Sequence, residues 1–262
     1  MIALRQGNSG WNLVAVDYTA SGRTVGTFED LSGLLQEPVE SFLVTDTCGG
    51  PTGRDTVQQW AGEINHPVDA VLAYCTGAVY ADALVTVLSD DQPAPRLLLI
   101  DPEGATDDQL IQQFAHVVTG KLGPALDEAS QQCLIAQSRE SNSTGSALAR
   151  HLSQLLDEAA AQPLAALGLG PRAAADMLAA IGGYLSYLGG AIELPAPTHW
   201  CRALVINSAS SDSGLDALAA DAQMSFRTRI DVPVDYADVL RSPITAIAVD
   251  EWLASASAEA EQ

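Results

Sequence analysis

The chain has 262 residues, 47% of them hydrophobic, and a formal net charge of −21. The length predicts one large domain, or one domain with an inserted subdomain, and the hydrophobic fraction excludes global disorder. The negative charge argues against nucleic acid and against an anionic membrane surface as partners. Apolar runs such as Leu97–Ile100 are too short to span a bilayer, so no membrane association is expected.

The N-terminal ten residues lack an apolar signal core, which predicts a cytoplasmic protein. The four cysteines are Cys48, Cys75, Cys133 and Cys201, and they form no C-x-x-C pair and show no zinc-ligand spacing. Reduced thiols are therefore expected, rather than disulfides or a structural metal, and no bound cofactor is expected.

Strand and helix patterns alternate over the first hundred residues. Strands are predicted at 12–18, 41–45, up to Tyr74 and at 96–100, with helices at 27–35, from Asp55 or Thr56 to Ile64, and from Val79 to about Leu88. Near-continuous apolar strands separated by helices predict a mostly parallel sheet with helices on both faces. Functional side chains are then expected beyond the carboxyl ends of the strands, where Cys75 and Asp101 lie.

The next stretch changes character, because it is rich in Ala, Gln and Leu and has no clear strand pattern. Helices are predicted near 107–119, 124–139, 145–161 and 171–188. We interpret residues 105–194 as a helical lid inserted into a core formed by residues 1–104 and 195–262. The apolar face around Tyr184 and Leu188 predicts either a substrate channel or ordinary helix packing.

Strand patterns resume after this insertion, at 202–207 and 226–232. The loop 208–214 contains Asp212, and the loop 232–238 contains Tyr236. A last helix is predicted from Ser242-Pro243, and the small, acidic tail 254–262 is expected to be frayed.

Residues Ala73-Tyr74-Cys75-Thr76-Gly77 have the pattern of a strand, a sharp turn and a helix. They resemble the nucleophile elbow G-x-S-x-G, with the first Gly changed to Ala and Ser changed to Cys. At the N-terminus of a helix, backbone N–H groups and the helix dipole are expected to lower the thiol pKa of Cys75. The structural alternative is a buried core cysteine at a strand end.

The order of these parts resembles the thioesterase branch of the α/β-hydrolases, which serves polyketide and non-ribosomal peptide synthetases. The resemblance covers nearly the whole chain and rests on the elbow at 73–77, the strand end at 98–102, the helical insertion, and the C-terminal sequences at 232–243 and 251–253. It implies an α/β-hydrolase fold, with a small acyl substrate carried as a phosphopantetheine thioester on an acyl or peptidyl carrier protein.

The family's roles carry over by position. The nucleophile falls on Cys75, and the triad acid on Asp101 or, as in stand-alone members, on Asp212. The oxyanion donors would be the backbone N–H of Thr76 and one from the Thr19-Ala20 loop.

The family's catalytic histidine falls on Tyr236, so the chain departs from the family at both nucleophile and base. A cysteine is partly ionised near neutral pH and tolerates this loss better than a serine would. Hydrolysis should suffer, because water needs a general base to attack an acyl-enzyme. Alternative bases are Asp235 and Asp238, or a lid histidine, His116 or His151; His66 and His199 precede strands and should lie at the opposite edge.

The leading hypothesis is acyl transfer or cyclisation through an acyl-Cys75 enzyme, to an amine, a hydroxyl or a carrier thiol. The alternative is a non-hydrolytic pseudo-enzyme, or a cyclase or isomerase that uses Asp101, Asp212 or Tyr236 for proton transfer. A third possibility is an ordinary hydrolase with a histidine from the lid. Docking an acidic carrier would need a local basic face, for which the candidates are Arg23, Arg54, Arg227, Arg229 and Arg241.

Overall fold

The computed structural model describes residues 1–262 apart from residues 8, 19–24, 46–49, 211–225 and 261–262 and the side chains of residues 161–162 and 256–260. The chain divides into two compact units. The core unit comprises Met1–Asp46, Val57–Gly104 and Pro195–Gln262. The helical unit comprises Thr47–Thr56 and Ala105–Leu194. The two units are described separately below.

The core unit contains a seven-stranded sheet with the strand order β1-β3-β2-β4-β5-β6-β7. The strands are β1 (Ile2–Gln6), β2 (Trp11–Val16), β3 (Val39–Val44), β4 (Ala70–Tyr74), β5 (Arg96–Ile100), β6 (Leu204–Asn207) and β7 (Thr228–Asp231). Every pairing is parallel except that of β1 with β3. The register sets Ala70 beside Arg96 and Tyr74 beside Ile100, so β4 and β5 end level with each other.

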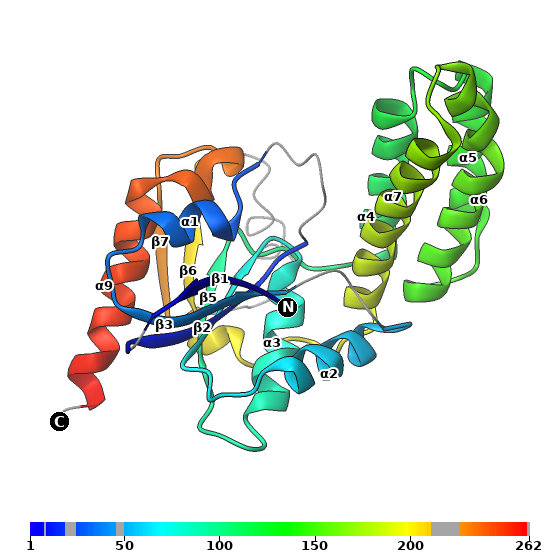
Figure 1. The fold of residues 1–262 in the computed structure, drawn as a ribbon. Coiled ribbons are helices and arrows are strands. Elements are labelled where there is room, and N and C mark those ends of the chain that lie inside the picture. The colour runs from blue at the N-terminus through cyan, green and yellow to red at the C-terminus, as the bar shows by residue number, and fades with distance from the viewer. Residues whose placement is uncertain (8, 19–24, 46–49, 211–225, 261–262) are drawn as a thin grey trace. The chain divides into compact units, whose positions relative to one another are not determined.

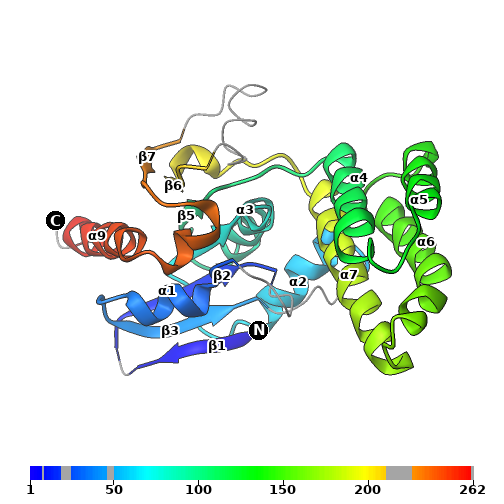
Figure 2. The ribbon, with the colours of Figure 1, turned by 90° about the horizontal axis from the view of Figure 1, so that it is seen from above.

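Helices cover both faces of this sheet (Figures 1 and 2). Side chains alternate between the faces along each strand, and one face packs against α1 (Phe28–Leu34) and α9 (Pro243–Ala260) in a single apolar cluster. The other face meets α3 (Gly77–Leu88), which contacts β2, β4 and β5. Because both faces are covered, the central strands are fully buried, as in β4.

Shorter elements complete the core unit. The 3₁₀ segments η2 (Trp200–Arg202) and η3 (Tyr236–Arg241) precede β6 and α9 respectively. Helix α2 (Gly53–Glu63) begins in the helical unit and continues in the core unit, where Trp60 contacts Tyr80 of α3 with ring centroids 5.4 Å apart.

The helical unit contains α4 (Asp107–His116), a π-helical turn η1 (Val117–Lys121), α5 (Glu128–Glu140), α6 (Gly145–Ala166) and α7 (Pro171–Ile192). The long helices α6 and α7 pack against each other. A Cβ atom at Gly189 would lie 2.7 Å from both Ala149 Cβ and Gly145 O, so α7 can approach α6 this closely only with glycine there. In α7, the apolar side chains of Leu185 and Leu188 are buried.

The predicted strands and helices recur with small shifts, but two features differ. Strand β1 is not predicted, because it is an edge strand with little burial and no clear alternation. Helix α9 continues to Ala260, so the acidic tail is helical over most of its length rather than frayed. The alanines of this segment, which favour helix, explain the extension.

Candidate functional site

Cys75 occupies the turn between β4 and α3. Its φ of 55° lies in the left-handed region, which costs a non-glycine residue about 1–3 kcal/mol. The Cys75 N–H donates to Ile100 O at 3.1 Å, and its carbonyl accepts from the Ala78 N–H at 3.0 Å. The side chain is half-buried at the start of α3, which is the strand–turn–helix arrangement that the sequence predicts.

Glu103 is the polar partner of this thiol. The Cys75 thiol donates to Glu103 Oε2 at an Sγ–Oε2 distance of 3.0 Å, and the Glu103 N–H donates to the Cys75 carbonyl at 3.2 Å. Both residues belong to the core unit. Sequence reasoning missed Glu103, although one signal was available: it follows Asp101 by two positions at the end of the strand beside β4.

The environment of the thiol is opposite to the one expected for a helix N-terminus. Burial raises the pKa of Cys75 to about 12, and the negative charge of Glu103 is the next largest cause of this increase. Hydrogen bonds from Tyr236 and Thr76 lower the pKa but do not offset these effects. Burial also raises the pKa of Glu103. The expected lowering of the Cys75 pKa is therefore wrong, because burial and the adjacent carboxylate outweigh the helix N-terminus.

Asp101 holds the matching position at the end of β5. It also has a positive φ, 43°, and its N–H donates to Ile206 O at 2.9 Å. Its buried carboxylate accepts from the Ser208 N–H at 2.7 Å through Oδ1, while no described residue donates to Oδ2. Burial raises the pKa of this carboxyl group. In the described residues, Asp101 thus connects the ends of β5 and β6.

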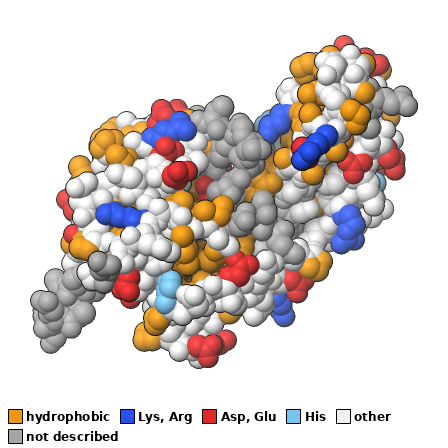
Figure 3. All heavy atoms as spheres, in the orientation of Figure 1, with side chains coloured by type: hydrophobic (Ala, Val, Ile, Leu, Met, Phe, Trp, Pro, Cys, Tyr) orange, Lys and Arg blue, Asp and Glu red, His pale blue; other side chains and the backbone are white. Residues whose placement is uncertain are grey.

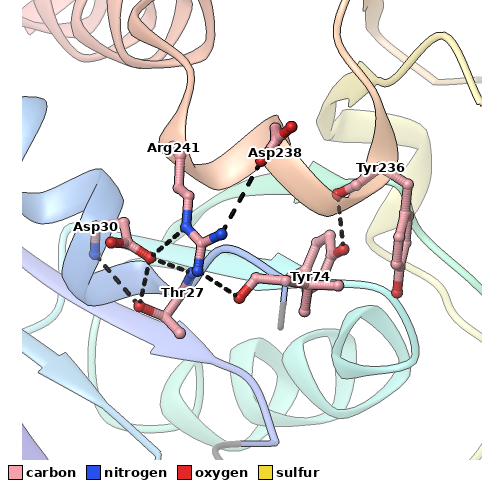
Figure 4. A network of polar contacts seen from close by, with 7 residues as sticks. Thr27, Asp30, Tyr74, Tyr236, Asp238 and Arg241 are labelled. Carbon is pink, nitrogen blue, oxygen red and sulfur yellow. Dashed lines mark hydrogen bonds and ion pairs between the residues drawn. The ribbon is translucent and has the colours of Figure 1, made fainter. Parts of the chain in front are cut away.

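Tyr236 is the residue at the position for which the sequence resemblance predicts a histidine. Its ring stacks on that of Tyr74 with centroids 5.1 Å apart, and the Tyr74 hydroxyl donates to the Tyr236 carbonyl at 3.1 Å (Figure 4). Burial, and then the charge of Cys75, raise the pKa of Tyr236. Tyr236 is therefore a protonated hydroxyl at neutral pH and no base.

A polar network anchors η3, and with it Tyr236, to the start of α1 (Figure 4). Arg241 pairs with Asp30 at 3.3 Å, and Asp30 forms a capping box with Thr27, the N-cap of α1. Asp238 lies 4.0 Å from Arg241. Asp235 caps η3 by accepting from the Ala237 N–H at 3.0 Å. Asp235 and Asp238 thus have local structural contacts of their own.

The core unit brings four of the predicted site residues, Cys75, Thr76, Asp101 and Tyr236, to the carboxyl ends of its strands, and adds Glu103. Thr19, Ala20 and Asp212 lie outside the described residues, as do Arg23 and Cys48.

The histidines are distributed over both units. His66 and His199 precede β4 and β6, at the amino edge of the sheet as expected, whereas His116 and His151 belong to α4 and α6 of the helical unit.

Arg227, one of the arginines proposed for carrier docking, does not lie at the edge of the sheet that holds Cys75. Arg227 directly precedes β7, so it lies at the amino edge of the sheet, opposite to the edge that holds Cys75. Arg229 is paired with Asp231 at 2.7 Å. Of the five arginines proposed for carrier docking, Arg241 lies on η3, the described core-unit segment that also carries the site residue Tyr236.

No group of three or more His, Cys, Asp or Glu in the described part of the chain is arranged to hold a metal ion. Cys75, Cys133 and Cys201 are free thiols. Among the described helices, none has the length and hydropathy required to cross a membrane.

Comparison with known proteins gives similarity in structure alone. No family model matches the chain, and no curated protein matches it. It is similar to holo-AB3403, a four-domain nonribosomal peptide synthetase bound to AMP and glycine, with 16% identity, 96% of this chain and 20% of that chain covered, and a TM-score of 0.53.

It is also similar to wild-type DBJA, with 13% identity, 97% and 94% of the two chains covered and a TM-score of 0.50. A Vlm2 thioesterase domain, with 2,3-diaminopropionic acid and a bound dodecadepsipeptide, is 19% identical over 96% and 95% of the chains, with a TM-score of 0.49. The sheet order, the turn at Cys75 and the first two similarities show that this chain has the predicted α/β-hydrolase fold.

Proposed function

We propose that this chain is a thioesterase-like acyltransferase that takes an acyl group from a phosphopantetheine thioester onto Cys75. The observation that carries the proposal is the Cys75–Glu103 pair, with Sγ and Oε2 3.0 Å apart at the elbow of an α/β-hydrolase fold. A nucleophile within hydrogen-bond reach of a base is the signature of covalent catalysis. Glu103 would be the proton acceptor, in place of the histidine that the resemblance assigns to the position of Tyr236.

Acylation proceeds by general-base catalysis. Glu103 takes the thiol proton as Sγ forms its bond to the thioester carbonyl carbon, so that no free thiolate accumulates beside a carboxylate. The carbonyl oxygen becomes the oxyanion, for which the Thr76 N–H is the proposed donor. The bond between the carbonyl carbon and the pantetheine sulfur then breaks, and protonated Glu103 returns its proton to the leaving thiolate.

Release uses the same groups in reverse. An amine, a hydroxyl of the acyl chain or a second carrier thiol attacks the acyl-Cys75 carbonyl, and Glu103 takes the proton of that nucleophile. The carbon–sulfur bond to Cys75 breaks, and the proton passes from Glu103 to Sγ. A raised Glu103 pKa suits both directions, because it makes this carboxylate a stronger proton acceptor than an ordinary glutamate.

Intact-protein mass spectrometry after incubation with acyl-pantetheine thioesters tests this proposal. The native chain should gain one acyl mass, and Cys75→Ala should gain none. Glu103→Gln should slow acylation by about 10²–10⁴-fold, the contribution of a positioned general base. Cys133→Ala, at an exposed cysteine, is the matched control and should acylate like the native chain. Acylation of Cys75→Ala at the native rate would overturn the proposal.

A second candidate function is proton transfer without a covalent intermediate, as in a cyclase or isomerase. The raised pKa values of Cys75 and Glu103 favour it, because they leave a neutral thiol beside a carboxyl group suited to general acid–base work. In this case no acyl adduct forms, and turnover of a carrier-bound substrate survives Cys75→Ala but not Glu103→Gln.

A further inference from the structure

A basic pocket lies in the core unit, away from Cys75. Its volume is about 290 Å³, and its lining includes Arg96, Arg202, Arg227, His199, Trp252 and Ser255. Among the described residues that line it there is no Asp or Glu. The whole chain has 12 Lys and Arg against 33 Asp and Glu, so three arginines around one pocket are a marked local concentration of positive charge.

Arg96 is held in place by α9. Its guanidinium carbon lies 4.3 Å from the centroid of the Trp252 ring, and it donates to the Trp252 carbonyl at 2.7 Å and to Ser255 Oγ at 3.4 Å. Stacking and hydrogen bonding fix the plane of this guanidinium. Less side-chain freedom then remains to be lost when a ligand binds.

Arg202 is fixed by a hydrogen-bonded chain. It donates to Nδ1 of His199, so the other ring nitrogen of a neutral His199, Nε2, carries the proton, 3.0 Å from Thr86 Oγ1. The Thr86 hydroxyl in turn donates to the Asp82 carbonyl at 3.0 Å. His199 therefore accepts from Arg202 without neutralising its positive charge.

Stacked aromatic rings bring the third arginine to the same place. Trp200 lies two residues before Arg202, and Phe226 lies directly before Arg227. The centroids of the two aromatic rings are 6.2 Å apart. This contact joins η2, which leads into β6, to the segment that leads into β7. The starts of β5, β6 and β7 thus each contribute one arginine.

The pocket is separate from the candidate active site. Arg96 pairs with Ala70 in the sheet, and Cys75 follows Ala70 by five positions along β4. At about 3.3 Å per residue this places the two sites roughly 16 Å apart, at opposite edges of the same sheet. A group bound at these arginines does not contact the thiol.

We propose that this pocket binds a small molecule through its phosphate group. The planar fork of arginine matches phosphate oxygens in pairs, and the guanidiniums of Arg96 and Arg202 are already oriented by their contacts. The volume lies at the lower end for small-ligand pockets, which favours a compact phosphorylated molecule over a protein surface. Because the net charge of −21 repels anions at long range, an anion would be held at this place by contacts within the pocket rather than by the overall charge of the chain.

Titration calorimetry of the full chain with inorganic phosphate, pyrophosphate and citrate tests the proposal. Phosphate or pyrophosphate should bind saturably with one site per chain. Arg202→Gln and Arg227→Gln should each weaken binding by about ten- to a hundredfold, as expected for the loss of a charge-assisted hydrogen bond. Arg172→Gln removes the same charge at a side chain that is 97% exposed on α7, and should bind like the native chain.

Three outcomes would overturn the assignment. The first is that neither phosphate nor pyrophosphate binds the native chain. The second is that both arginine variants bind like the native chain, which would place the ligand elsewhere. The third is that citrate binds as tightly as pyrophosphate, which would indicate a general anion site. The acylation of Cys75 should be measured in the same variants, and its retention separates failure of this site from failure of the proposed function.

Discussion

The thiol of Cys75 and the carboxyl group of Glu103 control each other's ionisation. Glu103 raises the pKa of Cys75 through its charge and its hydrogen bond, in addition to the larger effect of burial. Glu103→Gln removes the charge but keeps the shape, so the Cys75 pKa should fall from about 12 towards 9.0, the ordinary value, without reaching it. The thiolate fraction at any pH between these values should therefore increase.

The rate of iodoacetamide alkylation as a function of pH measures this change. The other three cysteines, Cys48, Cys133 and Cys201, are first replaced by alanine so that they do not contribute. The midpoint of the native profile should lie above that of Glu103→Gln. If the two profiles coincide, Glu103 does not contact the thiol in solution.

If Cys75 carries an acyl group as proposed, we expect the residue at position 236 to affect, in addition to Glu103, how fast that group is lost to water. Its hydroxyl stays protonated because its pKa is raised, whereas a histidine accepts protons near neutral pH. Its backbone is held by Tyr74 and by Ser210 Oγ, which accepts from the Tyr236 N–H at 2.8 Å, so a new side chain should not displace the segment. Tyr236→His should then accelerate hydrolysis of acyl-Cys75 by up to ~10²–10⁴-fold.

Mass spectrometry of acyl-enzyme decay in water gives this rate directly. Tyr236→Phe is the matched control, since it keeps the ring that stacks on Tyr74 but supplies no base. An unchanged decay rate in Tyr236→His would mean that position 236 does not face the acyl group.

At the level of elements, Asp101 joins the ends of β5 and β6. Its Oδ1 accepts from the Ser208 N–H at 2.7 Å, and Asp101→Ala leaves this N–H unpaired. The loss should cost about 1–3 kcal/mol in the free energy of unfolding. Asp101→Asn keeps an oxygen acceptor and should cost less.

Urea unfolding of both variants, together with Cys75 acylation, separates a structural role for Asp101 from a catalytic one. A connecting role predicts lower stability for Asp101→Ala and near-native acylation for Asp101→Asn. A large loss of acylation in a stable Asp101→Asn variant would instead assign Asp101 to the reaction.

Most strands and helices can be predicted because they depend on the local pattern of apolar residues, whereas features that depend on contacts between distant residues are missed. The strands β4 and β5 are continuous apolar runs, and the turn at Cys75 has a recognisable motif, so both are predicted. Strand β1 depends on its pairing with β3, which no local signal encodes. Glu103 depends on how the chain turns after Asp101 and returns its N–H to the Cys75 carbonyl, a contact between residues far apart in sequence.

For the whole molecule, the charge constrains how an acidic carrier protein would approach. A net charge of −21 repels such a partner at long range, so association should be slow at low salt and faster when salt screens the repulsion. On the face drawn in Figure 3, basic side chains form isolated spots rather than a continuous patch. On this face, any attraction should therefore come from single residues.

Arg241 is the arginine that best meets this requirement, because η3 carries both it and Tyr236. Its ion pair with Asp30 joins two partly exposed side chains and should contribute about 0–1 kcal/mol to stability, so Arg241→Glu should fold. This reversal should weaken binding of a phosphopantetheinylated carrier by about 1 kcal/mol, roughly fivefold in Kd, and more at low salt than at high salt. Arg172→Glu makes the same charge change at a side chain that is 97% exposed on α7 and should leave carrier binding unchanged. Surface plasmon resonance over a range of salt concentrations distinguishes the two variants, and equal effects would place the carrier elsewhere on the surface.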